Sequence, residues 1–188
     1  MKKSFGPKTV IYPLPVLLIG TYDAEGKANI MTASWGGIIN SVPPMVSVSI
    51  RKGRHTFAAM MENQEFSISI PQVSKAREAD YCGIFSNSNS DKMSELGLNP
   101  IKSELINAPV FSEFPVVLLC KVSKTMDLGS HTLFASEILD FQVEESVLTD
   151  GKADIEKIDP LLYDTISHTY YSLGNKVKKA FNEKKIIL

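Results

Sequence analysis

Short apolar runs separated by polar turns recur along this chain and predict β-strands. Pro15–Tyr22 begins with the continuous apolar run Pro15–Gly20 and is expected to form a buried strand. Asp23–Lys27 is a polar turn of hairpin type, and Ala28–Ser34 is expected to form the returning strand. Met45–Ile50 and Glu65–Ile70 carry apolar and hydroxyl side chains in alternation, which is typical of half-buried strands. This part of the chain therefore predicts a sheet.

The second half of the chain contains the strongest hairpin signal. Pro115–Met126 and His131–Glu145 are two long strand-like runs. They are joined by Asp127–Ser130, a short polar connection that contains a glycine, as hairpin turns often do. We therefore expect these two runs to pair directly with each other.

Helical spacing of apolar residues is restricted to short segments between the strands. It predicts helices over His55–Glu62 and Ser74–Tyr81. Ile84–Asn99 is rich in Asn and Ser and is expected to be a loop with a short turn around Lys92–Leu96. Near the end, Gly174–Phe181 also places its apolar residues at helical spacing.

The order of these elements favours a barrel or a sandwich over a doubly wound sheet, because strands dominate and helices are inserted between them. The small residues that follow Trp35 are expected to form a corner between two strands. No linker, internal repeat or low-complexity tract interrupts the chain. We therefore expect residues 1–188 to form one domain.

Composition and charge exclude several classes of protein. Hydrophobic residues make up 44% of the chain and charged residues 22%, as in ordinary globular domains. The net charge of -1 argues against nucleic acid or an anionic membrane as a partner. No apolar run is long enough to cross a bilayer, and the N-terminal lysines are not followed by the apolar segment of a secretory signal. With two cysteines there is no disulfide framework, and we expect a cytoplasmic protein.

Candidate chemistry concentrates in the first third of the chain. Thr32, Ala33 and Ser34 are small and directly precede Trp35, the single tryptophan. Small side chains let a ligand approach the backbone, and an aromatic ring can stack on a flat ligand. A tryptophan is by itself more often a packing residue, so this interpretation depends on the small residues beside it.

A basic loop follows these residues and opens into the predicted helix at His55. Arg51 and Arg54 offer planar donors for phosphate oxygens, and Thr56 places a hydroxyl beside the free N–H groups of a helix start. A solvated basic turn with a helix cap explains the spacing equally well. Together with the neighbouring Trp35, the loop leads to the hypothesis of a phosphorylated, planar cofactor.

Several common sites are absent from the sequence. It has no Gly-x-Gly-x-x-Gly after a strand, no P-loop, no Gly-x-Ser-x-Gly and no cysteine cluster. Cys82 has no partner at Cys-x-x-Cys spacing, and three scattered histidines predict no metal site. A nicotinamide donor, if one is used, would therefore dock only transiently.

The order of motifs resembles one family. The segments Asn29-Ile-Met-Thr-Ala-Ser-Trp35, Pro43-Pro-Met-Val-Ser-Val-Ser-Ile-Arg51 and Arg54-His-Thr-Phe57 resemble the flavin reductase-like, FMN-binding split-barrel family. Within that family they are most similar to the flavoredoxin branch. Later segments extend the resemblance in the same order over nearly the whole chain: Asp80–Gly83, Asp91–Lys92, Leu128–Phe134 and Tyr170–Gly174.

The resemblance implies a mainly β fold with inserted helices, an FMN-binding split barrel of Greek-key type that forms a homodimer. It also implies FMN contacts from Lys92 and His131. Ser86 is followed by Asn87 where the family often has glycine, so the path of this loop departs from the family pattern. The predicted cofactor-binding residues are Asn29, Thr32, Ala33, Ser34, Trp35, Ser49, Ile50, Arg51, Arg54, Thr56, Cys82, Gly83, Ser86, Lys92 and His131.

Two classes of function fit this resemblance. The first is an NAD(P)H-dependent flavin reductase that passes electrons through bound FMN to free flavin or another acceptor. The second is a flavoredoxin-type electron carrier that exchanges electrons with other redox proteins and has no nicotinamide substrate of its own. In both classes the flavin performs the chemistry, so no catalytic side chain is predicted. A split barrel that binds a deazaflavin or haem is a weaker alternative, supported only by His131.

Overall fold

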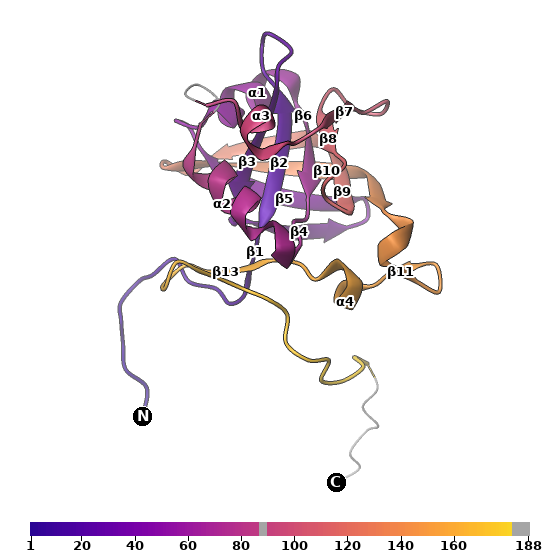
Figure 1. The fold of residues 1–188 in the computed structure, drawn as a ribbon. Coiled ribbons are helices and arrows are strands. Elements are labelled where there is room, and N and C mark those ends of the chain that lie inside the picture. Colours follow the sequence, from indigo (N-terminus) through magenta and orange to yellow (C-terminus); the bar gives the residue numbers. More distant parts are fainter. Residues whose placement is uncertain (87–89, 182–188) are drawn as a thin grey trace.

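The computed structural model describes residues 1–86 and 90–181 and is built around a curled β-sheet with helices packed against it (Figure 1). The main sheet contains seven strands, all paired antiparallel. In spatial order these are β3 (Ala28–Ala33), β2 (Leu17–Tyr22), β6 (Glu65–Ser69), β9 (Val116–Asp127), β10 (His131–Val143), β5 (Pro44–Arg51) and β4 (Gly36–Ser41).

Four strands in the middle of this sheet have Greek-key order. β5, β6, β9 and β10 occur in this order along the chain, but in space β5 lies beside β10 rather than beside β6. The sheet ends at β3 on one side and at β4 on the other, so the barrel that it forms is open. The predicted mainly β barrel of Greek-key type is confirmed.

Shorter elements surround the main sheet in the described residues. The helices are α1 (His55–Asn63), α2 (Ala76–Ile84), α3 (Lys92–Leu96) and α4 (Ile155–Ile158), with 3-10 turns at Val73–Lys75 and Glu145–Val147. The short strands are β1 (Leu14–Pro15), β13 (Leu162–Asp164) and β14 (Thr169–Tyr171) in one sheet, β7 (Pro100–Lys102) with β8 (Pro109–Phe111), and β11 (Leu148–Thr149) with β12 (Lys152–Ala153).

Successive residues of β2 enter two different hydrophobic cores. Leu17 and Ile19 belong to a core that also contains Phe66 and Phe134, whereas Leu18 belongs to a second core that includes side chains of α2. Side chains alternate between the two faces of a strand, so both faces of β2 are buried. This explains the continuous apolar run in the sequence, and it fixes the neighbouring strand β3, whose end borders the site described below.

Most of the predicted elements are confirmed. β2, β3, β5 and β6 occupy the segments expected to be strands, and α1, α2 and α3 occupy the expected helical segments and turn. α2 is preceded by a 3-10 turn and continues to Ile84, beyond the predicted end. β9 and β10 form the predicted hairpin, in which the Leu128 N–H donates to the His131 carbonyl at 2.9 Å.

Two predictions of local structure are wrong. The small residues after Trp35 form strand β4 rather than a corner, because β4 pairs with β5 along its length. Residues 174–181 form no helix. Val177 and Phe181 are fully exposed, so among the described residues no side chain packs against the apolar face that would stabilise so short a helix.

The N-terminal segment and residues 172–181 extend from the same side of the barrel (Figure 1). None of the helices in the described ranges has the length and hydrophobicity needed to cross a bilayer.

Candidate functional site

A pocket of about 420 Å³ lies where the ends of β3 and β5 meet the start of β10, α2 and the β13–β14 hairpin. Small-molecule sites in proteins typically have volumes of about 300–1,000 Å³. Most of the predicted cofactor residues line this pocket: Thr32, Ala33, Ser34, Trp35, Ser49, Ile50, Arg51, Arg54, Gly83 and His131. The other predicted residues do not line it: Asn29, Thr56, Cys82, Ser86 and Lys92.

Trp35 and His131 form an aromatic surface in the pocket. Their ring centroids are 6.2 Å apart and their planes differ by 8°. Trp35 is 41% exposed and is therefore not a core residue. The Ser49 N–H donates to the Trp35 carbonyl at 2.7 Å, which fixes the backbone just before β4. The pair offers a flat face of the kind on which a planar ligand stacks.

Arg51 and Arg54 give the pocket its permanent positive charge. Arg51 ends β5 and lies opposite His131 in the β5–β10 pairing. Burial and, to a smaller extent, the charge of Arg51 lower the pKa of His131, which favours the neutral imidazole. His131 Nδ1 lies 2.9 Å from Ser130 Oγ, and the ring can therefore act as a neutral hydrogen-bonding group beside the guanidinium groups.

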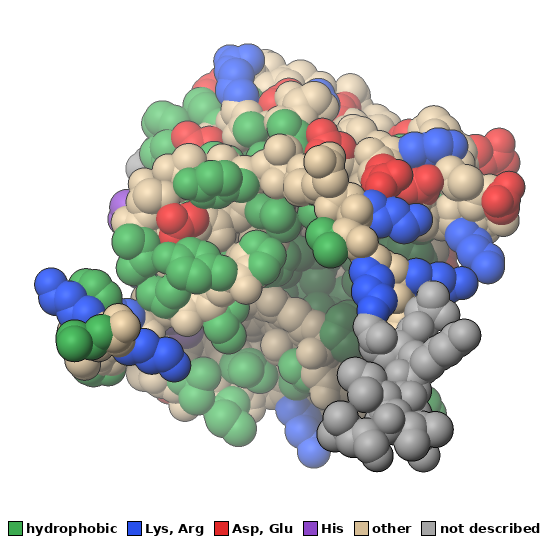
Figure 2. Space-filling view, turned by 90° about the horizontal axis from the view of Figure 1, so that it is seen from below, with side chains coloured by type: hydrophobic (Ala, Val, Ile, Leu, Met, Phe, Trp, Pro, Cys, Tyr) green, Lys and Arg blue, Asp and Glu red, His purple; other side chains and the backbone are tan. Residues whose placement is uncertain are grey.

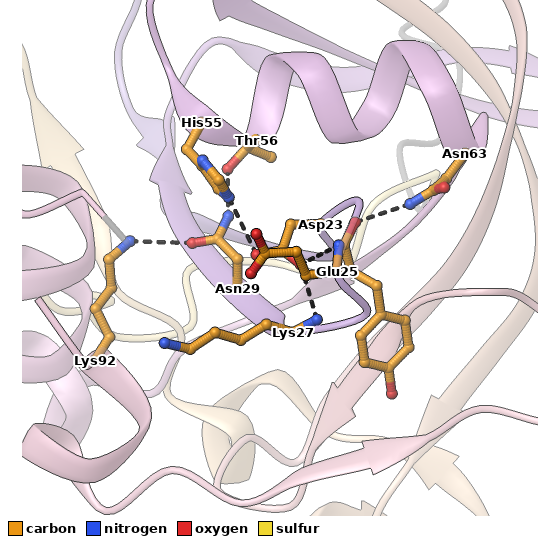
Figure 3. A network of polar contacts seen from close by, with 9 residues as sticks. Asp23, Glu25, Lys27, Asn29, His55, Thr56, Asn63 and Lys92 are labelled. Atoms are coloured by element: carbon orange, nitrogen blue, oxygen red, sulfur yellow. Dashed lines mark hydrogen bonds and ion pairs between the residues drawn. The ribbon is translucent and has the colours of Figure 1, made fainter. Parts of the chain in front are cut away.

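Three of the predicted residues that do not line the pocket form a buried polar chain (Figure 3). Lys92 Nζ donates to Asn29 Oδ1 at 3.4 Å and to the Ile30 carbonyl at 2.7 Å. Asn29 Nδ2 in turn donates to Thr56 Oγ1 at 2.8 Å. Each of the three side chains belongs to a residue that is at most 2% exposed. The chain connects α3, β3 and the first turn of α1.

Lys92 is a buried amine for which the described residues supply no acidic partner. Within residues 1–86 and 90–181, no carboxylate lies within ion-pair distance of its Nζ. Burial lowers the pKa of this amine, and the charge of Arg54 lowers it further, while Cys82 acts in the opposite direction. An unpaired buried charge is costly, and a bound anion near Arg54 would supply the missing counter-charge. The end of the pocket at Arg54 therefore fits a phosphate group.

The remaining predicted residues belong to α2 and the segment after it. Cys82 is fully buried in the second core, and burial raises the pKa of its thiol to about 11. The next residue, Gly83, lines the pocket, and a Cβ there would lie 3.4 Å from Thr32 Cβ, an ordinary contact distance. Ser86 is half-buried and follows α2.

Several residues that line the pocket were not predicted from the sequence. They are Met31, Asp80, Ile84, Tyr163, His168 and Tyr170. Tyr170 Oη donates to Asp80 Oδ1 at 3.1 Å, which joins β14 to α2. Burial and the charge of Asp80 raise the pKa of Tyr170. The adjacent aromatic residues at Tyr170 could have indicated a contribution to the site. A local sequence pattern does not, however, reveal which distant helix a short strand will contact.

Comparison with known proteins gives a consistent answer. Residues 9–172 match the family described as flavin reductase like domain. The flavoredoxin of Desulfovibrio vulgaris (Miyazaki F) has a similar structure, with a TM-score of 0.92 and 44% identity over 97% of this chain and 98% of that chain. A flavoredoxin from Methanosarcina acetivorans has a TM-score of 0.89 and 33% identity over 97% of this chain and 96% of that chain.

A weaker similarity connects the chain to a reductase. The ferric-chelate reductase (NAD(P)H) of Archaeoglobus fulgidus is 26% identical over 136 residues, which are 71% of this chain and 79% of that protein. The split barrel and the flavoredoxin resemblance predicted from the motifs are both confirmed. This chain therefore belongs to the flavin reductase-like family, and its fold and sequence are similar to those of flavoredoxins.

Proposed function

We propose that this protein binds FMN in the pocket and passes electrons through it. The observation that supports FMN, rather than a flavin without phosphate, is the buried Lys92 amine beside Arg54, for which the described residues supply no carboxylate partner. A dianionic phosphate near these groups would replace the missing carboxylate and form charge-assisted hydrogen bonds. The aromatic surface of Trp35 and His131 suits the planar ring of the same cofactor.

In this proposal the protein binds and orients the cofactor, and the bound flavin supplies hydride and electron transfer. Thr32, Ala33 and Ser34 leave room for a ring to approach the backbone at the end of β3. Arg51 contributes planar hydrogen-bond donors to this edge of the pocket. Proton-transferring side chains are not required for the reaction.

FMN titration of the purified protein tests the proposal. We expect a yellow protein, or a colourless one that takes up one FMN per chain with quenched flavin fluorescence. Riboflavin should bind more weakly because it lacks the phosphate that Lys92 and Arg54 would pair with. A protein that ignores added FMN, or that instead takes up haem or a deazaflavin, would contradict the proposal.

We further propose that the protein is a reductase that accepts electrons from NADH or NADPH. The similarity to a ferric-chelate reductase (NAD(P)H) supports a nicotinamide donor, and the stronger similarity to flavoredoxins makes a carrier with protein partners the second candidate. Anaerobic titration separates the two. A reductase is bleached at the flavin absorbance band by stoichiometric NADH or NADPH, whereas a carrier is bleached by dithionite and by neither nucleotide.

A homodimer is the assembly that we propose. Hydrophobic side chains gather around a hollow on the face shown in Figure 2. β4 is an edge strand of the main sheet, and Ile38, Ile39 and Val42 in and just after it are 49–89% exposed. An edge strand with exposed apolar residues is a common place for chains to associate. From the sequence we also expect the apolar tail Ile186–Leu188 either to lie in the interface or to pack back on its own barrel, and these residues are outside the described residues.

The cytoplasmic location expected from the sequence is also a proposal. Cys82 and Cys120 are both buried and unpaired, as is usual for proteins of reducing compartments.

A further inference from the structure

The β13–β14 hairpin brings three aromatic rings to the pocket that the proposed FMN contacts do not use. Tyr163 is on β13, Tyr170 is on β14, and His168 lies in the turn between them. The Tyr163 and Tyr170 ring centroids are 5.5 Å apart, and those of Tyr163 and His168 are 6.4 Å apart. All three line the same pocket as Trp35 and Arg51. The hairpin therefore presents an aromatic cluster to any molecule that shares the pocket with the cofactor.

His168 is held in place by its neighbours. Its Nδ1 lies 2.8 Å from the Tyr163 hydroxyl. Its φ of 53° is in the left-handed region, which histidine adopts more readily than most residues. Asp164 fixes the turn before it by accepting hydrogen bonds from the Ile166 N–H at 2.8 Å and the Ser167 hydroxyl at 2.6 Å. The position of the imidazole is thus fixed by a hydrogen-bonded turn.

This arrangement leaves Nε2 of His168 open. In the described part of the chain this nitrogen has no hydrogen-bond partner, and the residue is exposed while lining the pocket. When the Tyr163 hydroxyl donates to Nδ1, a neutral imidazole carries its proton on Nε2 and is a donor there. His168 can therefore donate to a carbonyl oxygen of a bound ligand.

We propose that His168 and Tyr163 select the flat reactant that exchanges electrons with the bound flavin. Nε2 of His168 donates to an amide or imide carbonyl on the edge of the reactant, and the Tyr163 ring packs against its face. A nicotinamide and a free flavin share this chemistry, since both are flat rings with carbonyl groups on one edge. The inference rests on the proposed FMN function and extends it by assigning residues to the second reactant.

Two variants and one control test the assignment. His168→Gly tolerates the left-handed backbone and removes the imidazole. Tyr163→Phe keeps the ring and removes the hydroxyl that orients His168. Tyr171→Phe is the matched control, because Tyr171 lies in the same hairpin, is 53% exposed and does not line this pocket.

The kinetic measurements use the FMN-loaded protein with three probes: NADH, NADPH, and riboflavin mixed with photoreduced protein. We expect His168→Gly and Tyr163→Phe to lower the second-order rate constant for at least one probe about tenfold, the loss of one hydrogen bond. FMN affinity, measured by fluorescence, should change less than twofold in both. Tyr171→Phe should match the parent protein in both measurements.

Binding without turnover is a second readout. The protein contains three histidines, so the ¹⁵N signals of His168 can be assigned from their loss in His168→Gly. Adding NADP⁺ or NAD⁺ to the oxidised FMN protein should shift the Nε2 signal, and a purely structural role for His168 would leave it in place.

The outcomes separate this inference from the proposed function. A parent protein that does not bind FMN contradicts the proposed function itself. A parent protein that binds FMN but exchanges electrons with none of the three probes contradicts the assignment of a flat carbonyl-bearing reactant. Unchanged rate constants in both variants would show that His168 does not contact the second reactant. A parallel loss of FMN affinity in His168→Gly would assign His168 to the cofactor site and overturn its assignment to the second reactant.

Discussion

At the scale of single residues, Lys92 is the side chain on which cofactor choice should depend most strongly. Its amine is buried against the Ile30 carbonyl and Asn29, and none of the described residues places a carboxylate within ion-pair distance of it. A charge-assisted hydrogen bond to phosphate contributes roughly 1.5–3 kcal/mol, so Lys92→Met should weaken FMN binding by about one to two decades. Riboflavin affinity should stay nearly unchanged. Fluorescence titration of both flavins measures the two effects.

Lys52→Ala is the control for a general change in charge. Lys52 is exposed and forms an ion pair with Asp127 at 2.6 Å. Exposed pairs of this kind contribute little, so FMN affinity should remain within about twofold of the parent protein. Equal losses of affinity for FMN and for riboflavin in Lys92→Met would show that Lys92 stabilises the pocket without contacting the phosphate.

The two thiols should be inert in the folded protein. Burial raises the pKa of Cys82 to about 11 and that of Cys120 to about 12. At pH 8 the reactive thiolate of Cys82 is then about a thousandth of the total, and both residues have 0% exposure. We expect Ellman's reagent to react with neither thiol in the native state and with both in concentrated guanidinium chloride. Rapid reaction of one thiol under native conditions would reveal local opening around α2 or β9.

The site could be predicted from sequence only where its residues come from neighbouring segments. Trp35, Arg51 and Arg54 occur close together in the chain and were found from local chemistry, and all three line the pocket. Tyr163 and His168 reach the same pocket from the far end of the chain through the pairing of β1 with β13. Such long-range placement depends on tertiary packing, and a local pattern contains no information about it.

At the scale of secondary-structure elements, β4 depends on a glycine. A Cβ on Gly36 would lie 2.7 Å from Leu17 Cδ1 and 2.8 Å from the Ser47 carbonyl oxygen. Gly36→Ala should therefore force the strand away from β5 and lower the free energy of unfolding by about 1–3 kcal/mol. Urea denaturation measures this change.

The neighbouring glycine provides the matched control. A Cβ on Gly37 would meet no atom within 4 Å. Gly37→Ala should leave the stability unchanged or raise it by about 0.5–1 kcal/mol, because alanine has less conformational entropy to lose on folding. Similar destabilisation by both substitutions would mean that β4 is sensitive to backbone stiffness rather than to the close approach at Gly36.

A comparison of β4 with β9 and β10 explains why some elements could be predicted from the sequence and others could not. β9 and β10 are long, patterned and joined by a turn with a glycine, so each signal agreed with the others. β4 begins with two glycines and then exposes its apolar residues, so it lacks the alternation that marks a half-buried strand. Gly174–Phe181 shows the reverse case. Its apolar residues have helical spacing, but Val177 and Phe181 are exposed and no helix forms.

At the scale of the whole molecule, β4 is the place where we expect two chains to meet. The strand follows Trp35 directly, so a partner seated on it would lie next to the cofactor pocket. Ile38 is 69% exposed, and a charge there adds little strain to the single chain. Ile38→Asp should convert a dimer into a monomer in sedimentation velocity and weaken FMN binding, because a partner seated on β4 would shield the pocket from water.

Ile101→Asp controls for the effect of placing a charge on an exposed apolar residue. Ile101 is 50% exposed and lies on β7, which belongs to a separate two-stranded sheet. This variant should remain a dimer with normal FMN affinity. A chain truncated after Phe181 tests the other predicted contact, and a dimer that survives truncation would exclude the last residues and leave the interface to the strands. A parent protein that sediments as a monomer while binding FMN tightly would contradict the dimer altogether, and the exposed apolar residues of β4 would then need a partner other than a second copy.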